Sequence, residues 1–381
     1  MTGQFQLTDD QLAIQDMARK FTADRITPFA AQWDEDHHFP RDVVQAAGEL
    51  GFGSIYVSEE SGGIALGRLE AALIMEAMAY GCPATSAYIS IHNMAAWMID
   101  QFGGDDEKAR FLPSLVSMEK IASYALTEPG SGSDAAALKT TARLDGDHYV
   151  INGTKQFISG SGFNDIYVVM VRTSEDKSKG ITCLVVEKGT PGLSHGAPEK
   201  KLGWNASPTA QLIFEDCRVP VANRVGGEGE GFRFAMAGLD GGRLNIGACS
   251  LGGAQRCLDE AVKYTKERQQ FGQPIADFQN TQFMLADMAT DLEAARALLY
   301  LAAAKVTDNV PDKTRFSAMA KRLATDSGSK IVNDALQLFG GYGYLKDYPI
   351  ERFWRDLRVH SILEGTNQVM RMIVGRDMLR Q

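Results

Sequence analysis

The sequence is poor in the residues that build disulfide frameworks and metal centres. Its 381 residues include five cysteines, which are scattered along the chain without any CxxC spacing. This pattern is typical of free thiols in a reducing compartment. The six histidines form neither an HExxH nor an HxH pair. Because metal sites are usually built from such clusters, the sequence predicts no metal site.

Excess positive charge and long apolar runs are also missing. The net charge of −9 at pH 7 argues against a nucleic-acid or anionic-membrane partner. No apolar run approaches the length that spans a bilayer. The N-terminal residues resemble neither a secretory signal nor an Arg-rich presequence. We therefore expect a soluble protein without a membrane or nucleic-acid partner. Its expected location is a bacterial cytoplasm, or the mitochondrial matrix if a presequence was removed.

A third absence concerns nucleotide binding. The chain contains no strand–GxGxxG–helix unit, which excludes a Rossmann-type dinucleotide site. The glycine-rich segment 227–231 reads Gly-Glu-Gly-Glu-Gly and has the wrong spacing. It predicts an acidic turn before a long helix.

Helical periodicity dominates the first part of the chain. Residues 8–11, Thr-Asp-Asp-Gln, predict a capping box at the start of a helix. Further helices are expected over residues 41–50 and 68–116, the latter with breaks at 81–83 and 103–104. We interpret residues 1–120 as an N-terminal α-helical domain.

The pattern then changes to short β-rich runs. Asp145-Gly146 and Asn152-Gly153 read as turn pairs around a short strand over 148–151. Other strands are expected over 165–173, 181–188 and 210–214. We interpret residues 121–228 as a middle β domain.

Helical periodicity returns after Gly231 and continues to the end. Helices are expected over residues 232–267, 278–309, 312–339 and 349–381. Long amphipathic helices of this kind pack as a bundle, so residues 229–381 read as a C-terminal four-helix bundle domain. Helices, then strands, then helices indicate an α+β fold.

The segment Ile362–Gln368 carries the first chemical signal. Glu364 lies between aliphatic residues and a glycine. Desolvation by aliphatic neighbours raises the pKa of a carboxyl group and makes its carboxylate a stronger base. Gly365 lets a substrate approach the backbone, and Thr366 and Gln368 offer polar groups to a second ligand. The alternative is an ordinary glutamate at a helix end.

The segment Tyr124–Asp134 is rich in hydroxyls and glycines, and such a loop can direct donors at a ligand. With Ile362–Gln368, it resembles the signatures of the acyl-CoA dehydrogenase family, and the resemblance covers nearly the whole chain. Residues 87–94 and 340–348 look most like members that act on isobutyryl-CoA. The resemblance implies FAD as cofactor and conversion of an acyl-CoA to its 2,3-enoyl-CoA.

The resemblance also implies roles for individual residues. Glu364 is the expected catalytic base, because the alternative position for a base in the family is occupied here by Gly242. The middle domain would contact FAD through Tyr124, Leu126, Thr127, Gly132, Ser133, Phe157, Ile158 and Ser159. The C-terminal domain would contact FAD through Arg268, Phe271, Phe278, Gln279, Gln337, Leu338, Gly340, Gly341, Thr366 and Gln368. Of these, the resemblance implies that Arg268 and the segment 337–341 reach the FAD of a neighbouring subunit. The acyl-CoA would contact Ser133, Asp240, Arg243 and Gly365.

Simpler interpretations stay open for several of these residues. Phe157 could be a core residue at a strand end, Arg268 a cation at a helix C-terminus, and Asp240 with Arg243 an ordinary i, i+3 pair. Gly340 and Gly341 could be only a helix C-cap.

The family pattern implies a homotetramer that passes electrons to an electron-transfer flavoprotein, here after oxidation of isobutyryl-CoA to methacrylyl-CoA in valine breakdown. The alternatives are a dehydrogenase for butyryl-CoA or for a 2-methyl-branched acyl-CoA, an oxidase that reduces O₂, and a non-catalytic acyl-CoA-binding relative.

Overall fold

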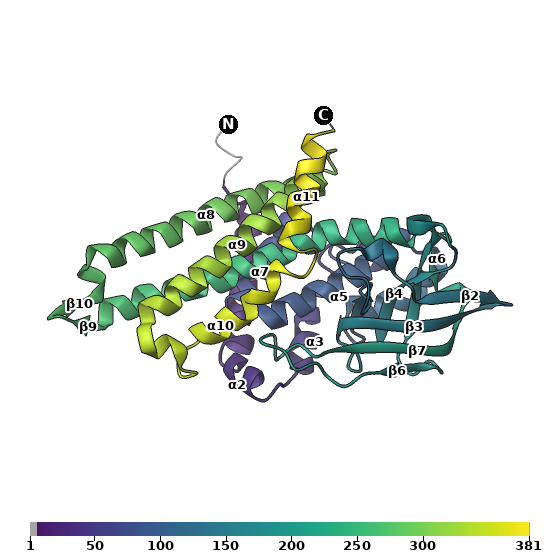
Figure 1. Cartoon of the computed structure of the whole chain (residues 1–381), viewed down its shortest axis with the longest axis horizontal. Coiled ribbons are helices and arrows are strands. Elements are labelled where there is room, and N and C mark those ends of the chain that lie inside the picture. Colours follow the sequence, from purple (N-terminus) through teal and green to yellow (C-terminus); the bar gives the residue numbers. More distant parts are fainter. Residues whose placement is uncertain (1–5, 381) are drawn as a thin grey trace.

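The computed structural model describes residues 6–380 and has helices at both ends of the sequence with a sheet between them (Figure 1). In Figure 1 the long helices of the C-terminal part extend to the left, and the sheet lies at the right. The predicted α+β fold is confirmed. None of the helices within residues 6–380 is long and apolar enough to cross a membrane.

The N-terminal helices follow the predicted pattern closely. They are α1 (Asp9–Phe21), α2 (Ala30–Glu35), α3 (Arg41–Glu49), α4 (Arg68–Ala79), α5 (Pro83–Phe102) and α6 (Asp105–Val116). The capping box is confirmed: Thr8 Oγ1 accepts the N–H of Gln11, and the Gln11 side chain accepts the N–H of Thr8. The short helix α2 and a π-helical turn over 22–26 were not predicted.

The middle segment forms one twisted sheet. Its strands are β1 (Ala122–Ala125), β2 (Thr141–Asp145), β3 (His148–Ser159), β4 (Ile166–Arg172), β5 (Ile181–Glu187), β6 (Leu193–His195), β7 (Thr209–Pro220) and β8 (Arg224–Val225). The order is β6-β7-β3-β2-β4-β5-β8, and β1 pairs with β4 in parallel.

The second predicted turn in this region is wrong. Asn152-Gly153 lies inside β3, which continues to Ser159 and pairs with β7. Gly153 sits at a register shift in that pairing, with φ of 143°. A Cβ on Gly153 would lie 2.7 Å from the backbone of Thr140. The glycine therefore marks a bulge with close backbone approach, which the dipeptide alone does not distinguish from a turn.

The C-terminal segment is built on three long helices. They are α7 (Gly231–Glu267), α8 (Gln279–Thr307) and α9 (Lys313–Phe339), followed by α10 (Ile350–Leu357) and α11 (Asn367–Met378). A two-stranded ribbon of β9 (Gln269–Gln270) and β10 (Gln273–Pro274) joins α7 to α8. The predicted single helix over 349–381 is wrong, because a 3-10 turn and an irregular segment separate α10 from α11.

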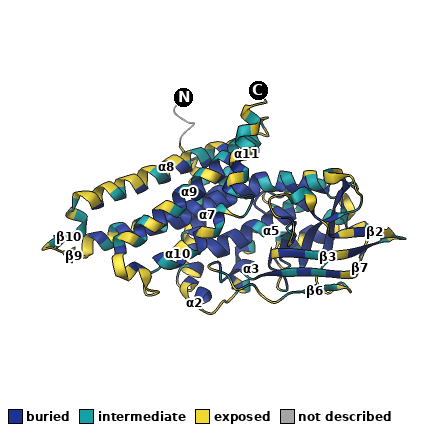
Figure 2. Cartoon of the chain, in the orientation of Figure 1, coloured by how far each residue is buried: buried dark blue, intermediate teal, exposed yellow. Residues whose placement is uncertain are grey.

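Helix α7 forms the centre of the molecule. It packs against α4, α5, α8 and α9, and Figure 2 shows its middle as buried, whereas much of α8 is exposed. Glycines allow this close packing: a Cβ on Gly252 would lie 2.1 Å from the carbonyl oxygen of Glu76 on α4.

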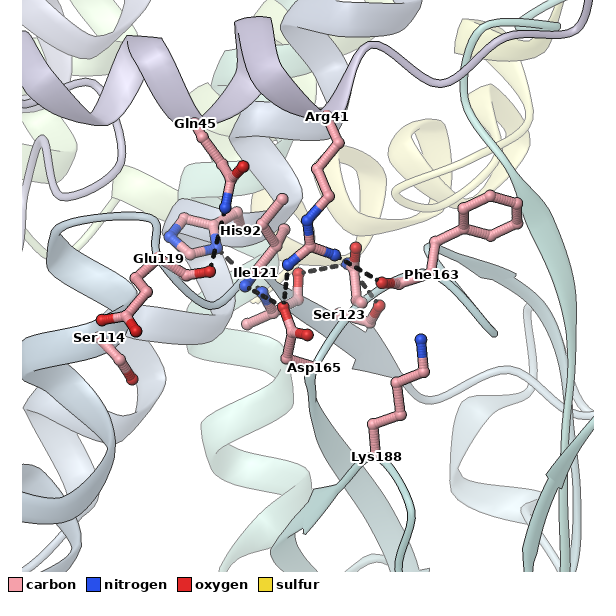
Figure 3. A network of polar contacts seen from close by, with 12 residues as sticks. Arg41, Gln45, His92, Ser114, Glu119, Ile121, Ser123, Phe163, Asp165 and Lys188 are labelled. Carbon is pink, nitrogen blue, oxygen red and sulfur yellow. Dashed lines mark hydrogen bonds and ion pairs between the residues drawn. The ribbon is translucent and has the colours of Figure 1, made fainter.

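A polar network joins the N-terminal helices to the sheet (Figure 3). Arg41 on α3 donates to Asp165 Oδ2 at 2.6 Å and to the carbonyl of Phe163 at 2.8 Å. Asp165 also accepts the N–H of Ile121. His92 on α5 accepts the N–H of Ala122 at 3.0 Å, at the start of β1. These contacts hold β1 against the N-terminal helices. Strand β1 contains Tyr124, the first residue of the segment Tyr124–Asp134.

Candidate active site

The break between α10 and α11 places Glu364 in an unusual backbone conformation. Glu364 and Gly365 both have positive φ, at 56° and 88°. The left-handed region costs a residue other than glycine about 1–3 kcal/mol, and surrounding contacts must hold it there. The chain then turns directly into α11, where Thr366 Oγ1 caps the helix by accepting the N–H of Val369.

The Glu364 carboxyl group is desolvated and lacks a partner. The residue as a whole is partly exposed, but its Oε2 atom is buried and has no hydrogen-bond partner within residues 6–380. Burial raises the pKa of Glu364 to about 7, although Arg243 and Lys321 lower it. A carboxyl group with this pKa can take up and release a proton near neutral pH.

Gly242 on α7 faces this carboxyl group. A Cβ built on Gly242 would lie 2.7 Å from Glu364 Oε2 and 3.0 Å from Glu364 Cδ. A side chain at position 242 and the Glu364 carboxyl group would therefore occupy the same space. The missing side chain at Gly242 leaves that space to Glu364.

Arg243 and Asp240 lie beside the base on the same helix. They form a buried ion pair with 2.8 Å between Arg243 Nη1 and Asp240 Oδ1. Asp240 Oδ2 also accepts the hydroxyl of Thr314 on α9 at 2.6 Å. Arg243 Nε donates to the backbone carbonyl of Glu364 at 3.3 Å. Arg243 thus supports the turn that carries Glu364, and its contact with the acyl-CoA stays a prediction.

A second cation holds the same turn from α9. Lys321 has no exposed side-chain surface. Its Nζ donates to the carbonyl of Gly365 at 2.8 Å and to Asn367 Oδ1 at 2.9 Å. Sequence reasoning missed Lys321. The available signal was its place on a helix face with the small residues Ser317, Ala324 and Thr325, all of which are buried in the structure.

The Tyr124 segment approaches the base from the sheet. Tyr124 lies in β1, and its hydroxyl is buried without a partner within the described residues. Burial, with a smaller contribution from the negative charge of Glu364, raises the pKa of Tyr124 well above its usual value. Two buried polar atoms without partners, Tyr124 Oη and Glu364 Oε2, therefore mark a place that suits a ligand.

A buried ion pair shapes the loop after β1. Lys155 on β3 contacts Glu128 at 2.8 Å and donates to the carbonyl of Leu126 at 3.1 Å. Glu128 accepts the backbone N–H groups of Lys139 and Thr140. These bonds fix both ends of the loop that contains Gly132 and Ser133, which are exposed.

Strand β3 brings the next predicted group beside this loop. The N–H of Gln156 donates to the carbonyl of Thr127 at 2.8 Å. Phe157 has φ of 59° and is 62% exposed, so its ring is not a core residue. Ile158 is buried, and the carbonyl of Ser159 accepts the hydroxyl of Ser123. The structure therefore brings the predicted middle-domain residues together.

The other predicted FAD residues lie elsewhere in the chain. These are Arg268 at the end of α7, Phe271 in the ribbon, and Phe278 and Gln279 at the start of α8; the ribbon forms the left tip in Figure 1. Gln337, Leu338, Gly340 and Gly341 lie near the end of α9. A pocket of about 390 Å³ joins the two groups and is lined by Arg268, Leu338, Gly340 and Gly341, among others. This tip and the sheet lie at opposite ends of the molecule (Figure 1).

Comparison with known families covers almost the whole chain. Residues 8–119, 123–217 and 229–379 match the N-terminal, middle and C-terminal domains of acyl-CoA dehydrogenases. The chain belongs to the acyl-CoA dehydrogenase family. Members of this family are FAD-dependent oxidoreductases that act on CH–CH bonds of acyl-CoA substrates.

Relatives within the family include two enzymes named for one substrate. The chain is 58% identical to the mitochondrial isobutyryl-CoA dehydrogenase of Dictyostelium discoideum, over 98% of this chain and 90% of the relative. It is 52% identical to the enzyme of the same name from Bos taurus, over the same shares of the two chains. Among solved structures, butyryl-CoA dehydrogenase from Megasphaera elsdenii has a TM-score of 0.96 at 38% identity, covering 98% of this chain and 99% of that one.

The residues near Glu364 fit the cofactor of this family. An aromatic ring held at the surface by a left-handed backbone, as at Phe157, offers a wall for a flat ring system. Tyr124 Oη and the hydroxyl-bearing loop around Thr127 offer hydrogen-bonding groups beside it. Thr366 and Gln368 lie just after the base, where Thr366 Oγ1 already caps α11. The individual FAD contacts stay predictions.

Proposed function

We propose that this acyl-CoA dehydrogenase oxidises isobutyryl-CoA to methacrylyl-CoA, and that Glu364 is its catalytic base. The observation that carries the proposal is the Glu364 carboxyl group. It is desolvated, its buried Oε2 atom has no hydrogen-bond partner within residues 6–380, and it packs directly against Gly242, where a side chain would displace it. The substrate follows from the two relatives of that name, which match this chain over nearly its full length.

The residues of this chain perform the proton transfer and the positioning. Glu364 takes the α-proton of the thioester, and its pKa of about 7 leaves a substantial fraction ionised at neutral pH. As the proton leaves, negative charge develops on the thioester oxygen. The backbone N–H of Glu364 donates to no acceptor within residues 6–380 and is therefore free to stabilise that charge. Bound FAD would accept the hydride from the β-carbon.

FAD would be held from two sides of the site. In the proposal, Tyr124, Thr127 and Ser133 face the flavin from the β1 loop, and Phe157 forms the wall. Thr366 and Gln368 approach from the C-terminal side. Because Arg268 and Gly340 lie at the far tip of the same chain, they would reach the FAD of a neighbouring subunit.

The assembly and the electron acceptor belong to the same proposal. Phe271 is 95% exposed and Tyr344 is 83% exposed at the tip that carries Arg268. A second copy of the chain would cover such apolar surface, which supports the homotetramer. A solved structure described as an electron-transferring flavoprotein of Acidaminococcus fermentans contains a chain 43% identical to this one, with a TM-score of 0.97. We infer that electrons pass to such a flavoprotein, in the mitochondrial matrix or a bacterial cytoplasm.

A panel of acyl-CoAs tests the function. Purified protein with FAD is mixed with isobutyryl-, butyryl-, 2-methylbutyryl- and isovaleryl-CoA, and bleaching of the flavin absorbance is followed. We expect the highest kcat/KM for isobutyryl-CoA, by about tenfold or more, because one methyl group is worth about 1–3 kcal/mol in a fitted pocket. Preference for butyryl-CoA would overturn the substrate but not the reaction.

A variant tests the base. Glu364→Gln keeps the size of the side chain and removes the proton acceptor. We expect a folded, flavin-containing protein whose bleaching rate falls by about 10²–10⁴. Bleaching at the wild-type rate would show that Glu364 is not the base. Rapid reoxidation by air without a protein acceptor would favour an oxidase.

A further inference from the structure

Lys321 is a buried cation with no directly paired carboxylate among the described residues. Its side chain has no exposed surface, and its hydrogen-bond acceptors are a backbone carbonyl and an amide oxygen. Burial lowers the pKa of Lys321 to about 8, and the negative charge of Glu364 opposes that change. A buried ammonium group is unfavourable unless neighbouring groups compensate it. A neutral side chain of similar length would fill the same space without this desolvation penalty. The buried ammonium group therefore indicates a role beyond packing.

The geometry around the base shows what the charge contacts. Arg243 Nε donates to the carbonyl of Glu364 at 3.3 Å, and Lys321 Nζ donates to the carbonyl of Gly365 at 2.8 Å. Two cations on different helices thus hold two consecutive carbonyls of one left-handed turn. Because the peptide plane between Glu364 and Gly365 is fixed in this way, the Glu364 side chain leaves the turn in one direction, toward Gly242.

A chain of side-chain hydrogen bonds anchors Lys321 to the rest of α9. Asn367 Oδ1 accepts from Lys321 Nζ at 2.9 Å. Asn367 Nδ2 donates to Thr325 Oγ1 at 2.9 Å and to Asp326 Oδ1 at 2.7 Å. Asn367 is the first residue of α11. The turn that carries the base is therefore attached to α9 at Gly365 and at Asn367, through groups one helical turn apart.

We propose that Lys321 is a positioning residue of the acyl-CoA dehydrogenase reaction: it fixes the Glu364–Asn367 turn and supplies positive charge that favours the ionised base. This inference rests on the proposed role of Glu364. Lys321 acts through the turn, because its hydrogen bonds go to the carbonyl of Gly365 and to Asn367 Oδ1.

The charged and titratable groups around the pair define the expected pH dependence. Arg243 and Lys321 face Glu364 with positive charge, and the hydroxyls of Tyr124 and Tyr56 face it from β1 and from the loop before α4. Lys321 is faced by Glu364, Arg243 and Asp326. The charge of Lys321, together with burial, also lowers the pKa of His360. Loss of the Lys321 charge therefore leaves Arg243 as the one full positive charge that favours ionised Glu364 among these groups.

The test compares Lys321→Met with the wild-type enzyme. Met keeps the length of the side chain and removes the charge and both hydrogen bonds. Bleaching of the flavin by isobutyryl-CoA at low concentration is measured against pH, because that second-order rate reports the pKa values of the free enzyme. We expect the acid-limb pKa to rise by about one unit or more, since a nearby opposite charge shifts a carboxyl group by about 1–3 units. The plateau rate should fall about tenfold or more as the turn loosens.

Two further variants sharpen the test. Lys330→Met changes an exposed lysine on the same helix, which pairs with Asp291 on α8, and should leave the pH profile unchanged. Lys321→Arg keeps the charge and should keep the acid-limb pKa near the wild-type value even where the plateau rate falls. If Lys321→Met does not fold, Lys321→Gln takes its place, because it removes the charge while keeping a hydrogen-bond donor. The acid-limb pKa of Lys321→Gln then tests the inference in the same way.

The outcomes separate this inference from the proposed function. If wild-type protein does not bleach with any acyl-CoA, or if Glu364→Gln bleaches normally, the proposed function fails. If wild-type protein bleaches and Glu364→Gln does not, but the neutral Lys321 variant keeps the wild-type pH profile and plateau, Lys321 is not a positioning residue. An upward shift of the acid limb in the neutral variant, absent from Lys330→Met, supports the inference.

Discussion

At the scale of single residues, the site depends on one carboxyl group held in a strained backbone. Glu364 has φ of 56° and a buried Oε2 atom without a hydrogen-bond partner in residues 6–380. Each feature lowers the stability of the folded state and is unusual for a surface glutamate. Here they occur together, next to two buried cations and opposite a glycine. Strained, desolvated groups of this kind are typical of catalytic positions.

The pKa of Glu364 predicts how its ionisation affects stability. Its folded-state pKa of about 7 lies above the ordinary value of 4.5. The stabilising contribution of the protonated group is therefore fully present below its unfolded pKa and is lost as pH rises through about 7. We expect Glu364→Gln to raise the melting temperature, relative to wild type, more at pH 8 than at pH 5. Differential scanning fluorimetry with saturating FAD measures both differences, and equal differences would contradict the assigned pKa.

Gly242 offers a second prediction at this scale. A Cβ there would lie 2.7 Å from Glu364 Oε2, and the flexible end of the glutamate would move away. Gly242→Ala should therefore fold but bleach its flavin about 10²-fold more slowly, because a misplacement of about 1 Å can cost that much. Gly375→Ala on α11 is the control, since nothing lies within 4 Å of a Cβ there. A Gly242→Ala enzyme with wild-type bleaching would show that the space is not needed.

At the scale of elements, the loop that follows Tyr124 runs from β1 to β2 and is held by β3. The buried pair of Lys155 and Glu128 ties the loop to β3 and to the start of β2. The pair is not an isolated contact, because Glu128 also accepts two backbone N–H groups and Lys155 donates to the carbonyl of Leu126. The position of the β1 loop thus depends on this ion pair and on the backbone hydrogen bonds that its two members make.

Breaking this pair should destabilise the protein and loosen the loop. Glu128→Gln leaves a buried lysine unpaired, so we expect the free energy of unfolding to fall by about 3–5 kcal/mol, together with FAD content. Adding Lys155→Met removes the unpaired charge and should recover part of the loss. Glu187→Gln, which breaks an exposed pair with Lys120 at 3.6 Å, should cost less than about 1 kcal/mol. Urea unfolding measures all three, and equal costs for Glu128→Gln and Glu187→Gln would count against this role.

At the scale of the whole molecule, the predicted FAD residues fall into two distant groups. One group lies beside the sheet, and the other lies at the tip of α7 and α9 (Figure 1). Arg268 stands over the ring of Tyr342, with 5.5 Å from its Cζ to the ring centroid, and is itself exposed. This separation is what a cofactor shared between two subunits would require.

Arg268→Ala tests that arrangement. Arg268 has no ion-pair partner among the described residues, so its planar guanidinium group is free for phosphate oxygens. We expect lower flavin absorbance per chain and a smaller mass by light scattering, both in the same variant. Arg218→Ala changes an exposed arginine on β7 that pairs with Asp145 and should alter neither. Full flavin content at unchanged mass in Arg268→Ala would contradict the shared site.

The sequence by itself determined the order of helical, strand-rich and helical segments, and it predicted Glu364 as the base. The capping box at Thr8, the breaks before Pro83 and after Phe102, and the long helices α7, α8 and α9 follow from local periodicity and cap chemistry. The residues on either side of Glu364 singled it out as a candidate, but Ile362 is 51% exposed, so this aliphatic neighbour does not bury the carboxyl group. Local patterns failed at Gly153 and over residues 349–381, where packing against distant backbone decides the conformation.

Only the tertiary structure decided which distant groups surround the base. Lys321 and Glu364 are 43 positions apart in sequence, and no local pattern indicates that Nζ of Lys321 would reach the carbonyl of Gly365. The carboxyl group acquires its raised pKa from burial by α7, α9 and β1 together. Desolvation and charge pairing act through space, so they arise only when the chain has brought these elements into contact.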